Sequence, residues 1–185
     1  GRNIATWNGS SGVAFRIGNL TAAQTTALTP AYATGNTATD YLNYLRGDRK
    51  HEAASTVTGS TKAFRTRTLL LGDIVDAKVT PVGPPAQNFS NANNPGYSAF
   101  KTTWATRSTM VYAGANDGML HAFNGALTGT TAGKEQFAYV PSALYQGPNG
   151  TPQDDGLAQL GNPGYAHRFY GNATAPAGIG HRLPE

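Results

Sequence analysis

The chain has 185 residues, a formal net charge of +4 and no cysteine, so disulfides, cysteine-ligated zinc and thiol catalysis are excluded. The basic residues are scattered rather than clustered, which argues against a nucleic-acid interface, and no apolar stretch approaches the ~20 residues of a membrane-spanning helix. Charged residues make up only 13% of the chain, about half the usual share, which favours a loop-rich, secreted β protein.

Residues 1–63 are predicted to form a leading segment that contains a hairpin and two short helices. The hairpin consists of two β-prone pieces, Ile4–Trp7 and Val13–Ile17. The sequence between them, Asn8-Gly9-Ser10-Ser11-Gly12, is rich in the residues that tight turns require.

Two short helices are expected after the hairpin. Leu20–Leu28 predicts the first, with Thr21 as its N-cap. Thr39–Arg46 predicts the second, because its apolar residues recur at helical spacing, and either Thr37 or Thr39 can cap it.

Residues 64–171 are predicted to supply the material of a first propeller-type blade. Phe64–Leu71 and Asp73–Val82 show the alternation that is typical of strands, and Tyr165–Tyr170 alternates again near the end of this region. Residues 172–185 show no periodicity and are predicted to be an irregular tail.

A turn-rich loop, Gly83–Gly96, leads into a predicted helix over Tyr97–Arg107. Tyr97, Phe100 and Trp104 fall on one face of this helix. We expect this aromatic stripe to pack into the core, and an exposed docking face is the alternative.

A regular series of three strands follows. Met110–Ala115 and Met119–Asn124 flank the turn Asn116-Asp117-Gly118, and Glu135–Val140 is the third strand. The Asp-Gly pair supplies the positive φ angle that a tight turn between antiparallel strands needs, so we assign these turn residues a structural role. Short strands at about ten-residue spacing are typical of a propeller or a sandwich.

Few residues point to chemistry, and we predict no catalytic residue and no metal ligand. The histidines lack ligand spacing, and His121 is expected to be a structural histidine within a strand. Asp154-Asp155 is predicted to be a solvated loop. Asp73 is expected to sit in a turn or to pair with Arg65 or Arg67.

The tripeptide Arg46-Gly47-Asp48 has two interpretations. It is an integrin-binding sequence, and an adhesive role is one hypothesis. The other is structural: Gly47 follows a predicted helix, where a left-handed C-cap is expected, and Arg46 lies near the last helical carbonyls.

Four segments stand out by their order and spacing: Tyr41–Arg49 followed by Glu52; Phe64–Asp76; Met110–Phe123 closed by Glu135–Leu144; and Tyr165–Phe169. Together they resemble the PilC/PilY family, proteins associated with the tip and assembly of type IV pili. The resemblance covers about residues 1–171. We refer to these segments below as the four family segments.

The resemblance implies a mainly β fold, a modified seven-bladed β-propeller. Since a blade takes about 40–50 residues, this chain would form only an incomplete propeller, with a few short helices in the leading segment and loops. The implied function is that of a non-enzymatic fragment of a pilus tip-associated protein, active in pilus assembly or surface adhesion. Minor pilins or the pilus tip complex are the expected partners, with a host surface as a further one.

The implied location is the cell surface, at the pilus tip or outer membrane, reached through the periplasm. Family members carry calcium in an aspartate-rich loop that this sequence lacks, so we expect no cofactor here, although the full-length family protein can bind calcium. The open edges of an incomplete sheet could support self-association. Two alternatives are a fragment of a quinoprotein-type dehydrogenase, which the Met110–Phe123 unit also resembles, and a purely structural scaffold.

Overall fold

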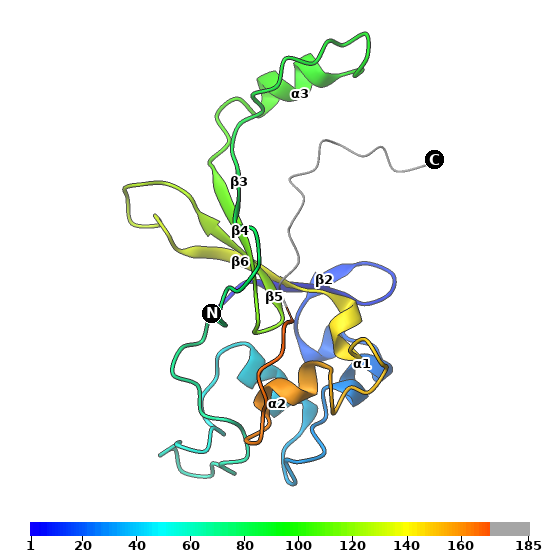
Figure 1. The fold of residues 1–185 in the computed structure, drawn as a ribbon, viewed down its shortest axis with the longest axis vertical. Helices are drawn as coiled ribbons and strands as arrows, with labels where there is room; N and C mark the ends of the chain where they lie inside the picture. Colours follow the sequence, from blue (N-terminus) through cyan, green and yellow to red (C-terminus); the bar gives the residue numbers. More distant parts are fainter. Residues whose placement is uncertain (171–185) are drawn as a thin grey trace.

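The computed structural model describes residues 1–170, so the predicted tail at 172–185 lies outside the described residues (Figure 1). Its six strands form one open sheet in the order β2-β1-β6-β5-β4-β3. The mainly β class with a few short helices, predicted from the sequence, is confirmed. The strands are β1 (Ile4–Trp7), β2 (Gly12–Ala14), β3 (Thr80–Val82), β4 (Met110–Ala115), β5 (Met119–Asn124) and β6 (Glu135–Val140).

In Figure 1 the helices lie beyond opposite ends of this sheet, with α1 and α2 near its lower end and α3 far above it. Three of them are short 3-10 helices. Their bounds are α1 (Ala22–Ala27), α2 (Ala38–Leu45), α3 (Tyr97–Thr103), η1 (Ile17–Asn19), η2 (Ser142–Tyr145) and η3 (Leu157–Gly161).

Strands β4, β5 and β6 form the antiparallel series that the sequence predicts, with the predicted bounds. Strand β1 then pairs with β6 in parallel, with Ile4 opposite Ala138. Strand β2 adds the predicted N-terminal hairpin at the far edge. One sheet therefore contains strands from the predicted leading segment (1–63) and from the predicted blade region (64–171). The boundary between these two regions stays a prediction.

Both helices of the leading segment begin with a capping box. The Thr21 hydroxyl accepts a hydrogen bond from the backbone N–H of Gln24, whose side chain accepts one from the Thr21 N–H. Thr37 and Asp40 form the same reciprocal pair at the start of α2. The predicted cap Thr21 is confirmed, and of the two candidates for α2 the cap is Thr37.

The strands predicted at Phe64–Leu71 and at most of Asp73–Val82 are wrong, since only Thr80–Val82 is a strand and Phe64 makes one isolated bridge. The alternation at 64–71 has another cause. Its arginines reach backbone carbonyls: Arg65 donates to Leu160 O at 3.1 Å and Arg67 to Tyr44 O at 2.8 Å. Side-chain bonds hold this segment across α2 without a sheet partner.

The strand predicted at Tyr165–Tyr170 is also wrong, because these residues are irregular. Their alternating side chains bind separate neighbours. The Arg65 guanidinium lies 4.5 Å from the centre of the Tyr165 ring, and the Tyr170 N–H donates to Asn116 Oδ1.

Helix α3 ends at Thr103, short of the predicted Arg107, and its aromatic stripe is exposed. Phe100 is 43% and Trp104 46% exposed, so the prediction that the stripe packs into the core is wrong. The helix lies on an excursion between β3 and β4 that extends away from the sheet, where none of the described elements covers it (Figure 1).

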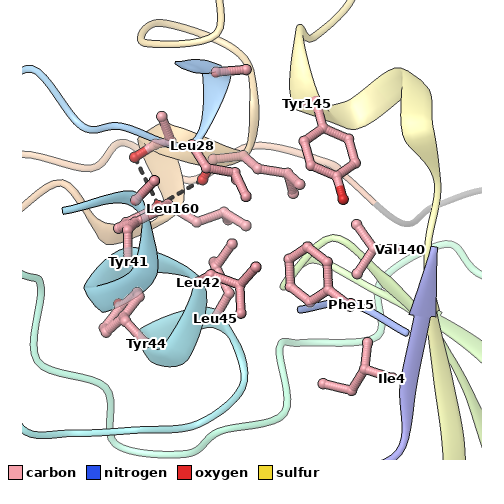
Figure 2. Packing of buried hydrophobic residues seen from close by; sticks show 14 of the residues in the cluster. Ile4, Phe15, Leu28, Tyr41, Leu42, Tyr44, Leu45, Val140, Tyr145 and Leu160 are labelled. Atoms are coloured by element: carbon pink, nitrogen blue, oxygen red, sulfur yellow. Dashed lines mark hydrogen bonds between the residues drawn. The ribbon is translucent and has the colours of Figure 1, made fainter. Parts of the chain in front are cut away.

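The core forms where α2 packs toward the sheet. Figure 2 shows Leu42 and Leu45 of α2 facing Phe15, with Val140 and Ile4 of the sheet behind it. All of these side chains are buried. Removing this apolar surface from water is the main force that attaches the leading segment to the strands.

A tyrosine at the centre of the core, Tyr41, is fully buried and fully bonded. Its hydroxyl donates to the carbonyls of Leu157 and Ala158, at 2.6 and 2.8 Å, and accepts from the Gly161 N–H at 2.9 Å. These bonds fix η3 against α2 (dashed lines in Figure 2).

Replacing Tyr41 by Phe should reduce the free energy of unfolding by about 1–3 kcal/mol, because buried backbone groups lose their partner. Urea unfolding of this chain measures the change. Tyr112→Phe is the control, since the Tyr112 hydroxyl bonds to none of the described residues. Equal effects of the two substitutions would contradict this assignment.

Candidate functional site

The family segments meet at the turn between β4 and β5. The Asn116 N–H donates to Asp73 O at 3.0 Å, and the Asn116 side-chain amide donates to Asp73 Oδ2 at 2.9 Å. The Gly72 N–H donates to Asp117 Oδ2 at 3.1 Å. We call these four residues and His167 the motif junction.

Gly72 can approach this turn only because it has no side chain. A Cβ atom at position 72 would lie 2.3 Å from the backbone nitrogen of Asp117 and 2.9 Å from the Asn116 carbonyl carbon. Both are backbone atoms and cannot move without opening the turn. The glycine therefore permits the contact between two family segments.

A third family segment reaches the junction through His167. Its Nε2 atom lies 2.8 Å from Asp73 Oδ2, in a half-exposed pair. Burial would raise the pKa of Asp73, but hydrogen bonds from Asn116 and His167 outweigh it and hold that pKa below its usual value. The predicted pairing of Asp73 with Arg65 or Arg67 is wrong.

Beside the junction, a buried histidine lies between two carboxylates. His121 is 0% exposed, as the predicted structural role requires. Its Nδ1 atom is 3.0 Å from Glu135 Oε2, and its Nε2 atom is 3.1 Å from Asp117 Oδ1. Arg2 donates to both oxygens of Glu135, at 2.9 and 2.7 Å. We call these four residues the charge cluster.

The charge cluster holds His121 in its protonated form. Burial lowers the pKa of His121, but the hydrogen bonds to Asp117 and Glu135 outweigh this and raise the pKa to about 9. Burial likewise opposes ionisation of Glu135, yet His121 and Arg2 lower its pKa to about 2. Since both ring nitrogens donate to carboxylates, neither can act as a base, and the arrangement favours a structural role.

The first family segment is held by a second buried carboxylate. Glu52 is 3% exposed and accepts from Arg67 Nε at 2.8 Å, with Arg49 3.6 Å away. The Arg67 guanidinium also lies 3.7 Å from the centre of the Tyr44 ring. These contacts fix the 64–71 segment onto α2.

The Arg46-Gly47-Asp48 tripeptide lies at the end of α2. The Arg46 guanidinium donates to Arg2 O at 2.7 Å and Phe15 O at 3.1 Å. Gly47 has a φ of 110°, the left-handed conformation of a helix C-cap, and the Asp48 carboxylate accepts from the Lys50 N–H. The arrangement accounts for the tripeptide structurally, while its adhesive role stays a prediction.

The acidic loop near the C-terminal end differs from the sequence expectation. Asp155 is 5% exposed, so the prediction of a solvated loop is wrong for this residue. Its carboxylate accepts from the side chains of Asn149 and Thr151, at 2.7 and 2.8 Å. Within residues 1–170, no group of three or more acidic or histidine side chains could hold a metal ion.

The sequence did not reveal the contact between Arg2 and Glu135 that completes the charge cluster. Arg2 and Glu135 are 133 positions apart and meet because β1 lies beside β6. This parallel pairing joins distant parts of the chain and leaves no local signal. The contact between Gly72 and Asp117 also leaves no local signal, because the two residues are 45 positions apart.

Gly72→Ala should destabilise the chain by about 1–3 kcal/mol, because the new methyl group overlaps backbone atoms. Gly12→Ala is the control, since a Cβ atom there meets nothing within 4 Å. Chemical denaturation of both variants measures the difference. The proposed contact fails if Gly72→Ala is as stable as Gly12→Ala.

The charge cluster should make stability depend on pH. The pKa of His121 is raised in the folded state, so its contribution is complete below about 6.5 and is lost as pH rises toward about 9. The loss is on the order of 3 kcal/mol. Glu135 contributes above about 4.5, and that contribution is lost as pH falls toward about 2.

Urea midpoints across this pH range measure the dependence, with His121→Gln as the matched variant. The decline above pH 6.5 should vanish in that variant. A wild-type chain whose stability stays constant between pH 6.5 and 9 would contradict the assignment.

The chain is similar to known proteins over much of its length. The family model described as "PilY1 beta-propeller domain" matches residues 71–175. The chain is 37% identical, over 71% of its length, to "Type IV pilus biogenesis factor PilY1" of Pseudomonas aeruginosa. It is 39% identical, over 72% of its length, to "Type IV pilus biogenesis factor PilY1 homolog" of Xylella fastidiosa.

The chain spans about a tenth of the length of these curated relatives. No solved structure matches it. The open sheet fits a partial propeller, as the resemblance implied, and no helix within residues 1–170 is long and apolar enough to cross a membrane. The chain belongs to the PilY1 β-propeller domain family.

Proposed function

We propose that this chain is a non-enzymatic part of a type IV pilus biogenesis factor and that it supports pilus assembly at the cell surface. The observation that carries the proposal is the match to the PilY1 β-propeller domain over residues 71–175. The relatives are named as pilus biogenesis factors, and we extend this role to the chain because it belongs to the same family.

The geometry supports a scaffold rather than a catalyst. The junction residues bind one another, and both nitrogens of His121 are engaged by carboxylates. The comparisons do not favour the alternative of a quinoprotein-type dehydrogenase.

Pilus components are the partners that we propose, minor pilins or the tip complex among them. An exposed apolar strip lies within the second family segment and just after it, and it offers a contact surface. It consists of Leu69, Leu71, Ile74 and Val79, which are 74, 40, 40 and 49% exposed. Apolar side chains gathered on one exposed segment are typical of a surface that another protein covers.

Self-association through the sheet edges is a weaker candidate for a contact. The edge strands β2 and β3 have three residues each, and Pro81 lies within β3. Short edges and an edge proline limit pairing with another strand.

The apolar strip can be tested in the full-length protein with the double substitution Leu69→Asp and Ile74→Asp. We expect pilus number and twitching to fall about tenfold at a normal protein level, because a charge in an apolar contact costs more than 1.4 kcal/mol. Val57→Asp, at a site 53% exposed outside the strip, is the control. Normal piliation in the double variant would count against the proposal.

A further inference from the structure

Two connections leave the sheet at the same end. The ends of β3 and β5 lie beside the start of β4, because Val82 and Asn124 both pair with Met110. Phe123 pairs with Glu135 at the start of β6. The β3–β4 connection (83–109), which we call the arm, and the β5–β6 connection (125–134) therefore share this end of the sheet (Figure 1).

The arm has an ordered internal structure. The Phe89 and Tyr97 rings pack edge to face at 5.2 Å, and Tyr97 and Phe100 lie 6.0 Å apart. Lys101 Nζ donates to Gln87 O at 3.2 Å, which ties helix α3 to the loop before it. At its base, Arg107 donates to Gly83 O. These contacts hold the aromatic residues of the arm in defined positions.

Large apolar side chains are exposed on both connections. Phe89, Phe100 and Trp104 of the arm are 38, 43 and 46% exposed, and Leu127 of the other connection is 97% exposed. The cost of leaving such side chains in water is offset when a partner covers them.

The charge on these connections has one sign. Residues 83–109 and 125–134 contain Lys101, Arg107 and Lys134 but no aspartate or glutamate, although the whole chain has 10 acidic residues. The nearest carboxylate, Glu135, is already bound by Arg2. The surface thus combines exposed aromatic and aliphatic groups with unopposed positive charge.

We propose that this end of the sheet docks onto an anionic lipid surface. Tryptophan, phenylalanine and leucine side chains insert at the boundary between headgroups and acyl chains, and the tryptophan ring, apolar with a polar N–H edge, is especially favoured there. Lysine and arginine beside them are attracted by anionic headgroups. A protein partner would satisfy the apolar groups, but it would need its own acidic patch to match the cations.

This proposal does not depend on the role in pilus assembly, because vesicle binding and piliation are measured separately. The test uses the full-length protein and flotation with phosphatidylcholine vesicles, either pure or containing phosphatidylglycerol. We expect flotation with the anionic vesicles and little with the neutral ones. High salt should weaken it, since Lys134 is exposed and Lys101 is only half-buried, so that salt screens both charges.

Three variants probe the surface. The double substitution Phe100→Ser and Trp104→Ser should weaken vesicle binding by at least about tenfold, because it removes two rings that the membrane would bury. Lys101→Gln and Lys134→Gln should each weaken it by about fivefold. Val57→Ser and Lys50→Gln are matched controls, since these exposed residues lie outside the two connections and outside the apolar strip.

A fluorophore attached at Trp104→Cys separates lipid from protein contact. Its emission should shift to the blue only when anionic vesicles are added. Emission that is already blue-shifted without vesicles would overturn the proposal, because it would place the arm against protein. Absence of flotation, or flotation unchanged in the double variant, would also overturn it.

Discussion

A buried positive charge constrains this structure more than any other single feature. His121 lies out of contact with water. Its imidazolium is stable there only because Asp117 and Glu135 each accept a hydrogen bond from one of its ring N–H groups. Glu135 in turn holds Arg2, the residue that leads into β1. This series of charge contacts therefore connects the β4–β5 turn to β1, the strand that belongs to the leading segment.

The segments that identify the family are explained by contacts between one another. Gly72 approaches the β4–β5 turn closely, and Asp117 binds the Gly72 N–H as well as His121. Arg67 and Glu52 fix the preceding segment to α2. The buried and hydrogen-bonded residues of the family segments thus specify how a leading segment, a hairpin and a linking segment are joined. Functional surfaces are expected on the exposed side chains, which include Leu69 and Ile74 of the second segment.

Local signals predicted part of this fold well. The turn chemistry at Asn116-Asp117-Gly118 and the flanking β-prone runs predicted β4 and β5, and Thr21 predicted the start of α1. The alternation of apolar and polar residues at Phe64–Leu71 wrongly predicted a strand. The arginines of this segment bind backbone carbonyls, whereas in a strand they would have faced water on one side of a sheet. Of the candidate site, the structural role of His121 was predictable, but the contact of Arg2 with Glu135 was not, since parallel pairing between the distant strands β1 and β6 creates it.

The protonation state of His121 tests the account most directly. Nitrogen chemical shifts of its ring, assigned by comparison with His121→Gln, report whether both nitrogens carry protons. We expect an imidazolium that persists at pH 8 and titrates near pH 9, since the pKa of His121 is raised to about 9. A neutral ring at pH 7 would show that the charge cluster does not hold the hairpin to the leading segment.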